Sequence, residues 1–250
     1  MLIIRAPGTN CDVETAFALR EAGADADLAH INKIIGRGGV LFDYQILVIP
    51  GGFTYGDDIS AGKVLANELR LKLGEAIRTF FDRGGLILGI CNGFQVLVKA
   101  GILPGGGKAE QTITLASNDS GRFECRWVYL RVNRESPCLF TEGIDFMYLP
   151  VANGEGKVVT RGESLPVSSI ALTYTDRYGS TRPSYPDDPS GSEGHIAGIC
   201  DKTGRIFALM PHPERHIRST HHPRWTRGKL AEYGDGFAIF RNAVRWARKI

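Results

Sequence analysis

The chain has 250 residues, of which 43% are hydrophobic and 23% are charged, a composition that excludes a disordered or fibrous protein. The formal net charge of +3 is too small to favour nucleic-acid binding, and no apolar run approaches the length of a membrane span. We therefore expect no nucleic-acid or membrane partner. The five cysteines are odd in number and widely scattered, which disfavours a disulfide framework, so we expect a cytoplasmic protein.

Residues 1–100 alternate short apolar runs with longer amphipathic runs, a pattern that predicts βαβ units and a parallel sheet. We expect strands at 2–6, 26–31, 44–50 and 86–90. We expect one helix at 11–23, where Thr9 and Asp12 stand in capping-box register, and another from about 60 to 81. The fourth strand is apolar throughout, as is typical of a central parallel strand.

From about residue 112 the sequence changes to strand-like pieces separated by glycine and polar turns, which predicts an antiparallel extension of the same domain. A buried strand at 205–210 and an amphipathic helix at 236–249 complete the pattern, and the segment 178–194 is typical of an exposed loop. We therefore expect a single α/β domain over 1–250, with an open, mostly parallel sheet flanked by helices and an additional antiparallel portion.

The sequence GICNG places Cys91 directly after an apolar strand and before a helical pattern, with Gly89 and Gly93 two residues to either side. A strand that turns at once into a helix crowds the corner residue, and small neighbours relieve that crowding, as in the nucleophile elbow G-x-S-x-G. At a helix N-terminus, unpaired N–H groups favour a thiolate and can hold an oxyanion. Cys91 is therefore a candidate nucleophile, and the alternative is a small buried hydrophobic residue.

A thiol nucleophile needs a base, and the base needs a group that orients it. Among the six histidines, His212 follows the apolar strand at 205–210, so we expect it at the same sheet edge as the cysteine. The prolines on either side hold this stretch extended, which lets His212 and Glu214 project to the same side. The alternative is a turn in which Glu214 pairs with Arg215 or with solvent.

The segment PGGFTYGDD at 50–58 also follows a predicted strand, and its paired glycines would let backbone amides approach a ligand. The alternative is a plain turn. The segment is not a phosphate-binding Walker loop, and no G-x-G-x-x-G follows a strand, so we expect no nucleotide cofactor on this chain. His212 and His216 are four residues apart, but Pro213 opposes a helix between them and H-E-x-x-H is absent, so we expect no metal.

A cysteine elbow, an earlier Pro-Gly-Gly and a later His-x-Glu, in this chain order, resemble a class I (triad) glutamine amidotransferase with its flavodoxin-like sheet. Within that group, PGGFTYGD, LGICNGFQVL, NGEG, HIAGI and MPHPER are similar to the separate glutaminase subunits of phosphoribosylformylglycinamidine synthases. The resemblance runs from the first strand to the C-terminal helix. Each motif alone is weak evidence, whereas five in order are highly specific.

The resemblance implies a catalytic triad. Cys91 would attack the side-chain amide of glutamine, His212 would carry the proton to the departing ammonia, and Glu214 would orient the imidazole. A γ-glutamyl thioester would form and then be hydrolysed.

The resemblance also implies substrate-binding residues. Backbone amides of Gly52 and Asn92 would hold the oxyanion, and Gln95 would help to bind glutamine. The family usually has histidine where this chain has Asn153, a departure that leaves the triad intact.

The family reaction passes ammonia from glutamine to formylglycinamide ribonucleotide with ATP, in purine biosynthesis. Because this chain shows no ATP site, the resemblance implies a separate synthetase subunit that carries ATP and Mg, often joined by a small third bridging subunit. We interpret the 178–194 loop and residues 219–225 as partner contacts, and the basic cluster within 221–229 as a solvated loop or partner-facing edge. Two alternatives remain, a cysteine hydrolase or peptidase with the same elbow and a regulatory or scaffold subunit without turnover.

Overall fold

The computed structural model describes residues 1–105, 111–162, 164–227 and 231–249, and its centre is a nine-stranded sheet. One half of the sheet is parallel and has the spatial order β2 (Asp27–His30), β1 (Leu2–Arg5), β3 (Ile46–Ile49), β4 (Leu86–Ile90) and β11 (Ile206–Leu209). The other half continues antiparallel with β10 (Ile196–Cys200), β9 (Ile170–Thr175), β6 (Glu124–Val132) and β7 (Phe146–Asn153). A separate antiparallel pair consists of β5 (Ile113–Ser117) and β8 (Glu155–Thr160).

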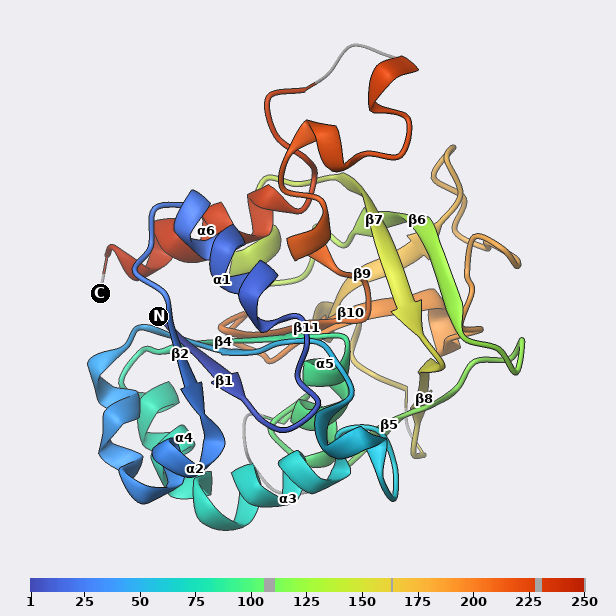
Figure 1. The fold of residues 1–250 in the computed structure, drawn as a ribbon. Coiled ribbons are helices and arrows are strands. Elements are labelled where there is room, and N and C mark those ends of the chain that lie inside the picture. The colour runs from blue at the N-terminus through green and yellow to red at the C-terminus, as the bar shows by residue number, and fades with distance from the viewer. Residues whose placement is uncertain (106–110, 163, 228–230, 250) are drawn as a thin grey trace.

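Helices cover both faces of the parallel half (Figure 1). One face carries α1 (Asp12–Glu21) and α6 (Phe237–Ala247), and the other carries α2 (Ile31–Gly36), α3 (Lys63–Lys72), α4 (Gly74–Asp82) and α5 (Asn92–Lys99). Because both faces are covered, β3, β4 and β11 are buried at every residue. The predicted α/β fold, with an open sheet, flanking helices and an antiparallel portion, is confirmed. Among the described residues, none of the helices has both the length and the apolar character needed to cross a bilayer.

The order of the parallel strands decides where a site can form. Strands β1, β3, β4 and β11 are neighbours in that part of the sheet and run in the same direction, so their carboxyl ends share one edge. The residues that follow those ends are Cys11 before α1, Gly52 after β3, Cys91 after β4 and His212 after β11. Open parallel sheets bind their ligands at this edge.

Two helix predictions were wrong in detail. The predicted helix at 60–81 is two helices, α3 and α4, because Leu73 between them has φ −125° and ψ 1° and leaves the α-helical path. Helix α1 begins without the predicted capping box, since its N-cap is Cys11, whose side chain makes no capping bond. Thr9 Oγ1 instead accepts a hydrogen bond of 3.0 Å from the Ala6 N–H, so it pairs with a donor of the preceding loop and not with one of the helix.

The segment 178–194 is exposed only in part. Tyr178 and Tyr185 are exposed, whereas Asp188, Ser190 and Ser192 are buried. The prediction of an exposed loop is therefore wrong for 188–192, because these small polar side chains lie in the interior, where Ser192 Oγ accepts a 3.1 Å hydrogen bond from the backbone of β8. In the basic cluster, the arginines at 224 and 227 are exposed, and the residue at 229 lies outside the described residues.

Candidate active site

The backbone at Cys91 forms the predicted elbow. Strand β4 ends at Ile90 and helix α5 begins at Asn92, so Cys91 makes the turn by itself, with φ 52° and ψ −107°. Such a conformation costs roughly 1–3 kcal/mol and persists only where the surrounding structure enforces it. A Cβ added at Gly93 would collide with the carbonyl oxygen of Ile49, and one at Gly89 would lie 2.8 Å from the Gly93 oxygen. The turn therefore requires glycine on both sides of Cys91.

The position of Cys91 suits a nucleophile. It is the N-cap of α5, and the Phe94 and Gln95 N–H groups bond to its carbonyl oxygen at 2.9 and 3.3 Å. Asn92 is the first helical residue, so its own N–H has no partner within the helix. Negative charge on or beside the thiol is favoured at such a helix terminus.

His212 and Glu214 form a buried pair. His212 Nδ1 lies 2.5 Å from Glu214 Oε1, and both side chains are almost fully buried. Burial alone lowers the pKa of His212, but the charges of Glu214 and Cys91 outweigh it and raise that pKa well above its usual range. His212 Nε2 has no partner in hydrogen-bond geometry among the described residues, which leaves this nitrogen available to a reacting group.

The backbone that carries this pair differs from the prediction. His212 itself is extended, with φ −103° and ψ 90°, but Pro213–Arg215 forms a 3-10 turn rather than extended chain. The turn still brings Glu214 onto the imidazole. The alternative in which Glu214 pairs with Arg215 is not seen, because Arg215 Nε instead bonds to Glu14 Oε1 at 3.0 Å.

Cys91 and His212 meet across a glycine. A Cβ added at Gly51 would lie 2.9 Å from His212 Cε1 and 3.4 Å from Cys91 Cβ, so only glycine lets the two side chains approach. Both line a cavity of about 150 Å³. The remaining lining residues are Asn10, Cys11, Gly52, Phe53, Phe123, Ala152 and Arg215.

Of the three predicted substrate-binding residues, Gly52 lines this cavity, and Asn92 and Gln95 are not among its lining residues. Gly52 lines it and has φ 140°, and a Cβ there would lie 2.8 Å from the Asn10 nitrogen. Asn92 and Gln95 are buried in the first turn of α5, where Asn92 Nδ2 donates a 2.9 Å hydrogen bond to Gln95 Oε1. Gln95 Nε2 also donates to the Glu155 carbonyl at 2.7 Å. Their roles toward glutamine stay predictions.

Cys11 is a site residue that sequence reasoning missed. Its Sγ lies 4.0 Å from His212 Nδ1 and accepts a 3.2 Å hydrogen bond from Arg215 Nη2. Burial raises the pKa of the Cys11 thiol, against the opposing effects of His212 and Arg215. A signal was present in the sequence, because Cys11, like Cys91, stands before a helix and a short way after a strand of the same parallel set.

One set of residues could in principle hold a metal. Ligand atoms of Cys11, His212 and Glu214 lie within 4.8 Å of one another. The set is poorly suited to a cation, because the His212 imidazole and the Glu214 carboxylate already bond to each other. The Cys11 sulfur also accepts a hydrogen bond from the positively charged Arg215 guanidinium. Nδ1 of His216, the other histidine considered for zinc, lies 2.8 Å from the Tyr148 carbonyl oxygen.

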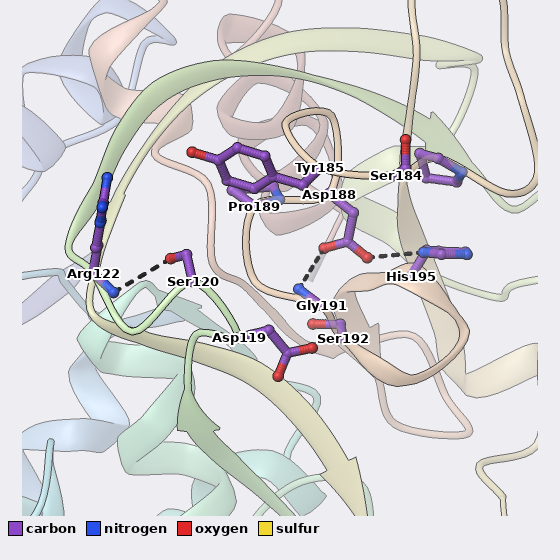
Figure 2. Close-up of a pocket in the computed structure, with 11 residues that line it drawn as sticks. Asp119, Ser120, Arg122, Ser184, Tyr185, Asp188, Pro189, Gly191, Ser192 and His195 are labelled. Carbon is purple, nitrogen blue, oxygen red and sulfur yellow. Dashed lines mark hydrogen bonds and ion pairs between the residues drawn. The ribbon is translucent and has the colours of Figure 1, made fainter.

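A second hollow, of about 570 Å³, lies beside the loop 183–195 (Figure 2). There Asp188 stands between the Gly191 N–H, at 3.0 Å, and His195 Nδ1, at 2.8 Å. His195 therefore has a carboxylate partner of its own. Among the described residues, His212 is the histidine that lines the Cys91 cavity.

Comparison with known proteins shows the family of this chain. A family model described as the CobB/CobQ-like glutamine amidotransferase domain matches residues 1–247. The chain belongs to the glutamine amidotransferase family. Phosphoribosylformylglycinamidine synthase subunit PurQ from Dehalococcoides mccartyi is 56% identical over 249 residues, covering 100% of this chain and 98% of the relative. The subunit of the same name from Methanococcus maripaludis is 41% identical over 266 residues, covering 100% and 97%.

The solved structures agree. A chain in the structure of PurLQS from Thermotoga maritima is 31% identical and has a TM-score of 0.75, covering 98% of this chain and 97% of that one. The expectation of a glutamine amidotransferase enzyme with this fold is confirmed, and the peptidase and scaffold alternatives are set aside.

Proposed function

We propose that this chain is the glutaminase subunit of a phosphoribosylformylglycinamidine synthase in purine biosynthesis. The observation that carries the proposal is its 56% identity, over the whole chain, to a subunit of that name. The cavity shared by Cys91 and His212 supports it, because amide hydrolysis through a thioester needs a nucleophile and a base side by side. The Glu214 carboxylate supplies the third, orienting group.

In the first half-reaction, the Cys91 thiolate attacks the side-chain carbonyl carbon of glutamine, and the carbonyl electrons move onto oxygen. The tetrahedral intermediate collapses and expels ammonia, which takes its proton from the His212 imidazolium. Glu214 keeps that proton available, because its charge raises the pKa of His212 against the effect of burial. The products are ammonia and a γ-glutamyl thioester on Cys91.

In the second half-reaction, His212 works as a base. It removes a proton from water, which attacks the thioester, and Cys91 leaves as a thiolate while glutamate is released. In both halves the oxyanion would accept hydrogen bonds from the backbone amides of Gly52 and Asn92. Removing one such donor typically costs about 3 kcal/mol in the barrier. Gln95, which lies in the first turn of α5, would help to hold the substrate glutamine.

The ammonia must reach an acceptor on another polypeptide. We infer a synthetase partner that carries ATP and Mg, with a small third subunit that bridges the two chains. The sequence of this chain offers no nucleotide motif, and its solved relative is a chain of a PurLQS structure. We also infer that residues 1–250 work as a single domain, since β1 and β11 share one sheet. We infer a cytoplasmic location from the odd number and wide scatter of the cysteines.

The test is a coupled assay of this chain mixed with a synthetase partner, ATP, Mg and formylglycinamide ribonucleotide. We expect glutamate and the amidine product to form in equal amounts from glutamine. Cys91→Ala should abolish glutamine-dependent synthesis and leave ammonia-dependent synthesis intact. A wild-type mixture that makes the amidine from ammonia but never from glutamine would contradict the proposed function.

A further inference from the structure

A buried lysine stands at the end of helix α5, the helix that begins at the elbow. Lys99 is the last residue of α5, and its side chain is only 6% exposed. Its Nζ donates to the Ala61 carbonyl at 2.6 Å and to Ser60 Oγ, and lies 3.9 Å from Glu155 Oε2. Buried lysines are rare and costly unless their donors are satisfied. The catalytic steps above make no use of this residue, so its burial needs another explanation.

The segment 53–62, to which Lys99 bonds at Ser60 and Ala61, has a strained backbone. Residues 53–62 follow Gly52, the expected oxyanion donor, and three of them that are not glycine have left-handed backbones: Tyr55 (φ 55°), Asp57 (φ 54°) and Ile59 (φ 71°). Each such residue costs on the order of 1–3 kcal/mol unless its surroundings enforce it. The segment 53–62 therefore depends on contacts with the rest of the protein to keep its shape.

Polar contacts at its other end tie the same segment to the elbow helix. Thr54 Oγ1 donates to Asn92 Oδ1 at 2.6 Å, and Asn92 Nδ2 donates to Asp57 Oδ1 at 3.1 Å. The Asp57 carboxylate also accepts a 3.3 Å bond from the Gly62 N–H. The segment is thus held near its start by Asn92 and near its end by Lys99.

These contacts form a closed ring. From Asn92 the bonds continue through Gln95 to the Glu155 carbonyl, and the Glu155 carboxylate faces the Lys99 ammonium. The side chains of Asn92 and Gln95, two residues predicted to bind substrate, therefore belong to the ring that Lys99 completes. The ring joins three parts of the chain that are far apart in sequence: the segment 53–62, helix α5 and Glu155. It therefore fixes their relative positions.

We propose that Lys99 is a positioning residue for the glutaminase reaction, holding the segment 53–62 so that the Gly52 amide stays beside Cys91. This inference rests on the proposed function. Lys99 does not touch glutamine. It acts through Ala61 and Ser60 on the oxyanion side of the cavity, where a displacement of a few tenths of an ångström weakens a hydrogen bond that forms only in the transition state.

The test compares Lys99→Met with Lys33→Met in the complex with the synthetase. Methionine keeps an unbranched side chain and removes the donors, and Lys33 is a control because it is an exposed lysine on α2. We expect Lys99→Met to lower kcat for glutamine on the order of tenfold, with a much smaller change in KM. Lys33→Met should leave both unchanged.

Two further readouts separate positioning from general destabilisation. Alkylation of Cys91 by iodoacetamide needs the thiolate and no oxyanion hole, so its rate should be unchanged in Lys99→Met. Ser60→Ala, which removes one acceptor of Lys99, should give a smaller fall in kcat with the same unchanged alkylation. An unchanged kcat in Lys99→Met would overturn the proposal, and so would a fall in kcat matched by equal falls in alkylation rate and Tm. Absence of glutamine-dependent product in the wild-type complex would instead count against the proposed function.

Discussion

At the scale of single residues, the proposed chemistry rests on a pair that the fold buries almost completely. His212 and Glu214 are both close to fully inaccessible, and Glu214 Oε2 has no hydrogen-bond partner among the described residues. A buried carboxylate beside an imidazole favours the imidazolium, which explains the raised pKa of His212. The His212 imidazole can then hold a proton at a pH where an isolated histidine has lost it.

This arrangement gives a pH prediction for Glu214→Gln. Neutralising Glu214 removes the charge that raises the pKa of His212 while burial still lowers it, so the pKa must fall. Expulsion of ammonia needs the imidazolium, so the basic limb of the pH profile of kcat/KM should move to lower pH, and kcat at neutral pH should fall by roughly 10²–10⁴-fold. Glu14→Gln is the matched control, because Glu14 bonds to Arg215 rather than to His212. A basic limb at the same pH in both variants would contradict this role of Glu214.

Much of the residue-level site could be predicted because its signals are local. The glycines around Cys91 and the short spacing from His212 to Glu214 lie within a few residues of each functional group. Cys11 and Lys99 escaped prediction for the opposite reason. Their significance comes from contacts with His212 and with the 60–61 backbone, which lie far away in the sequence. The position of Cys11 between a strand and a helix is a weak signal without those contacts, and nothing in the local pattern marks Lys99.

At the scale of elements, the junction between β4 and α5 is tightly packed. Gly93 has no space for a side chain, because an added Cβ would collide with the Ile49 carbonyl of the neighbouring strand β3. We predict that Gly93→Ala destabilises the protein by about 1–3 kcal/mol, since it forces backbone apart in a packed region. Gly36→Ala is the control, because a Cβ there meets nothing within 4 Å. Thermal unfolding of the two variants measures the difference, and equal Tm values would show that the elbow can relax.

Element boundaries were the least predictable part of the fold. Local patterns indicated the parallel strands, whose apolar runs are continuous, but they missed the break at Leu73 between α3 and α4. They also gave α1 a side-chain cap that Thr9 does not supply, because its hydroxyl is used by Ala6. The backbone angles at Leu73 and the hydrogen bond between Thr9 and Ala6 decide these boundaries, and residue type alone specifies neither.

At the scale of the whole molecule, exposed apolar side chains gather beside the cavity. Phe53 and Phe123 both line it and are partly exposed, with ring centroids 6.3 Å apart, and Ile59 on the adjoining segment is 88% exposed. Exposed apolar side chains that gather at one place commonly mark an interaction surface. The segment 53–62 thus joins an exposed apolar surface to the expected oxyanion donor at Gly52.

We predict that the isolated chain hydrolyses glutamine on the order of tenfold or more slowly than the same chain in its complex. A partner that binds the segment 53–62 would stabilise its active conformation, a form of induced fit. Glutamate release measured with and without the synthetase tests this, with Cys91→Ala as the blank. Equal turnover in both conditions would show that the isolated chain is already fully organised.

The measurement that tests the central claim most directly is intact-mass spectrometry after treatment with a glutamine-mimicking diazo-ketone. The account predicts a single adduct on Cys91, reduced by competing glutamine and absent from Cys91→Ala, while the other four cysteines remain unmodified. Such an adduct would establish the nucleophile and its glutamine pocket together. No adduct, even with the synthetase present, or an adduct that persists in Cys91→Ala, would contradict the assignment of the elbow as the catalytic centre.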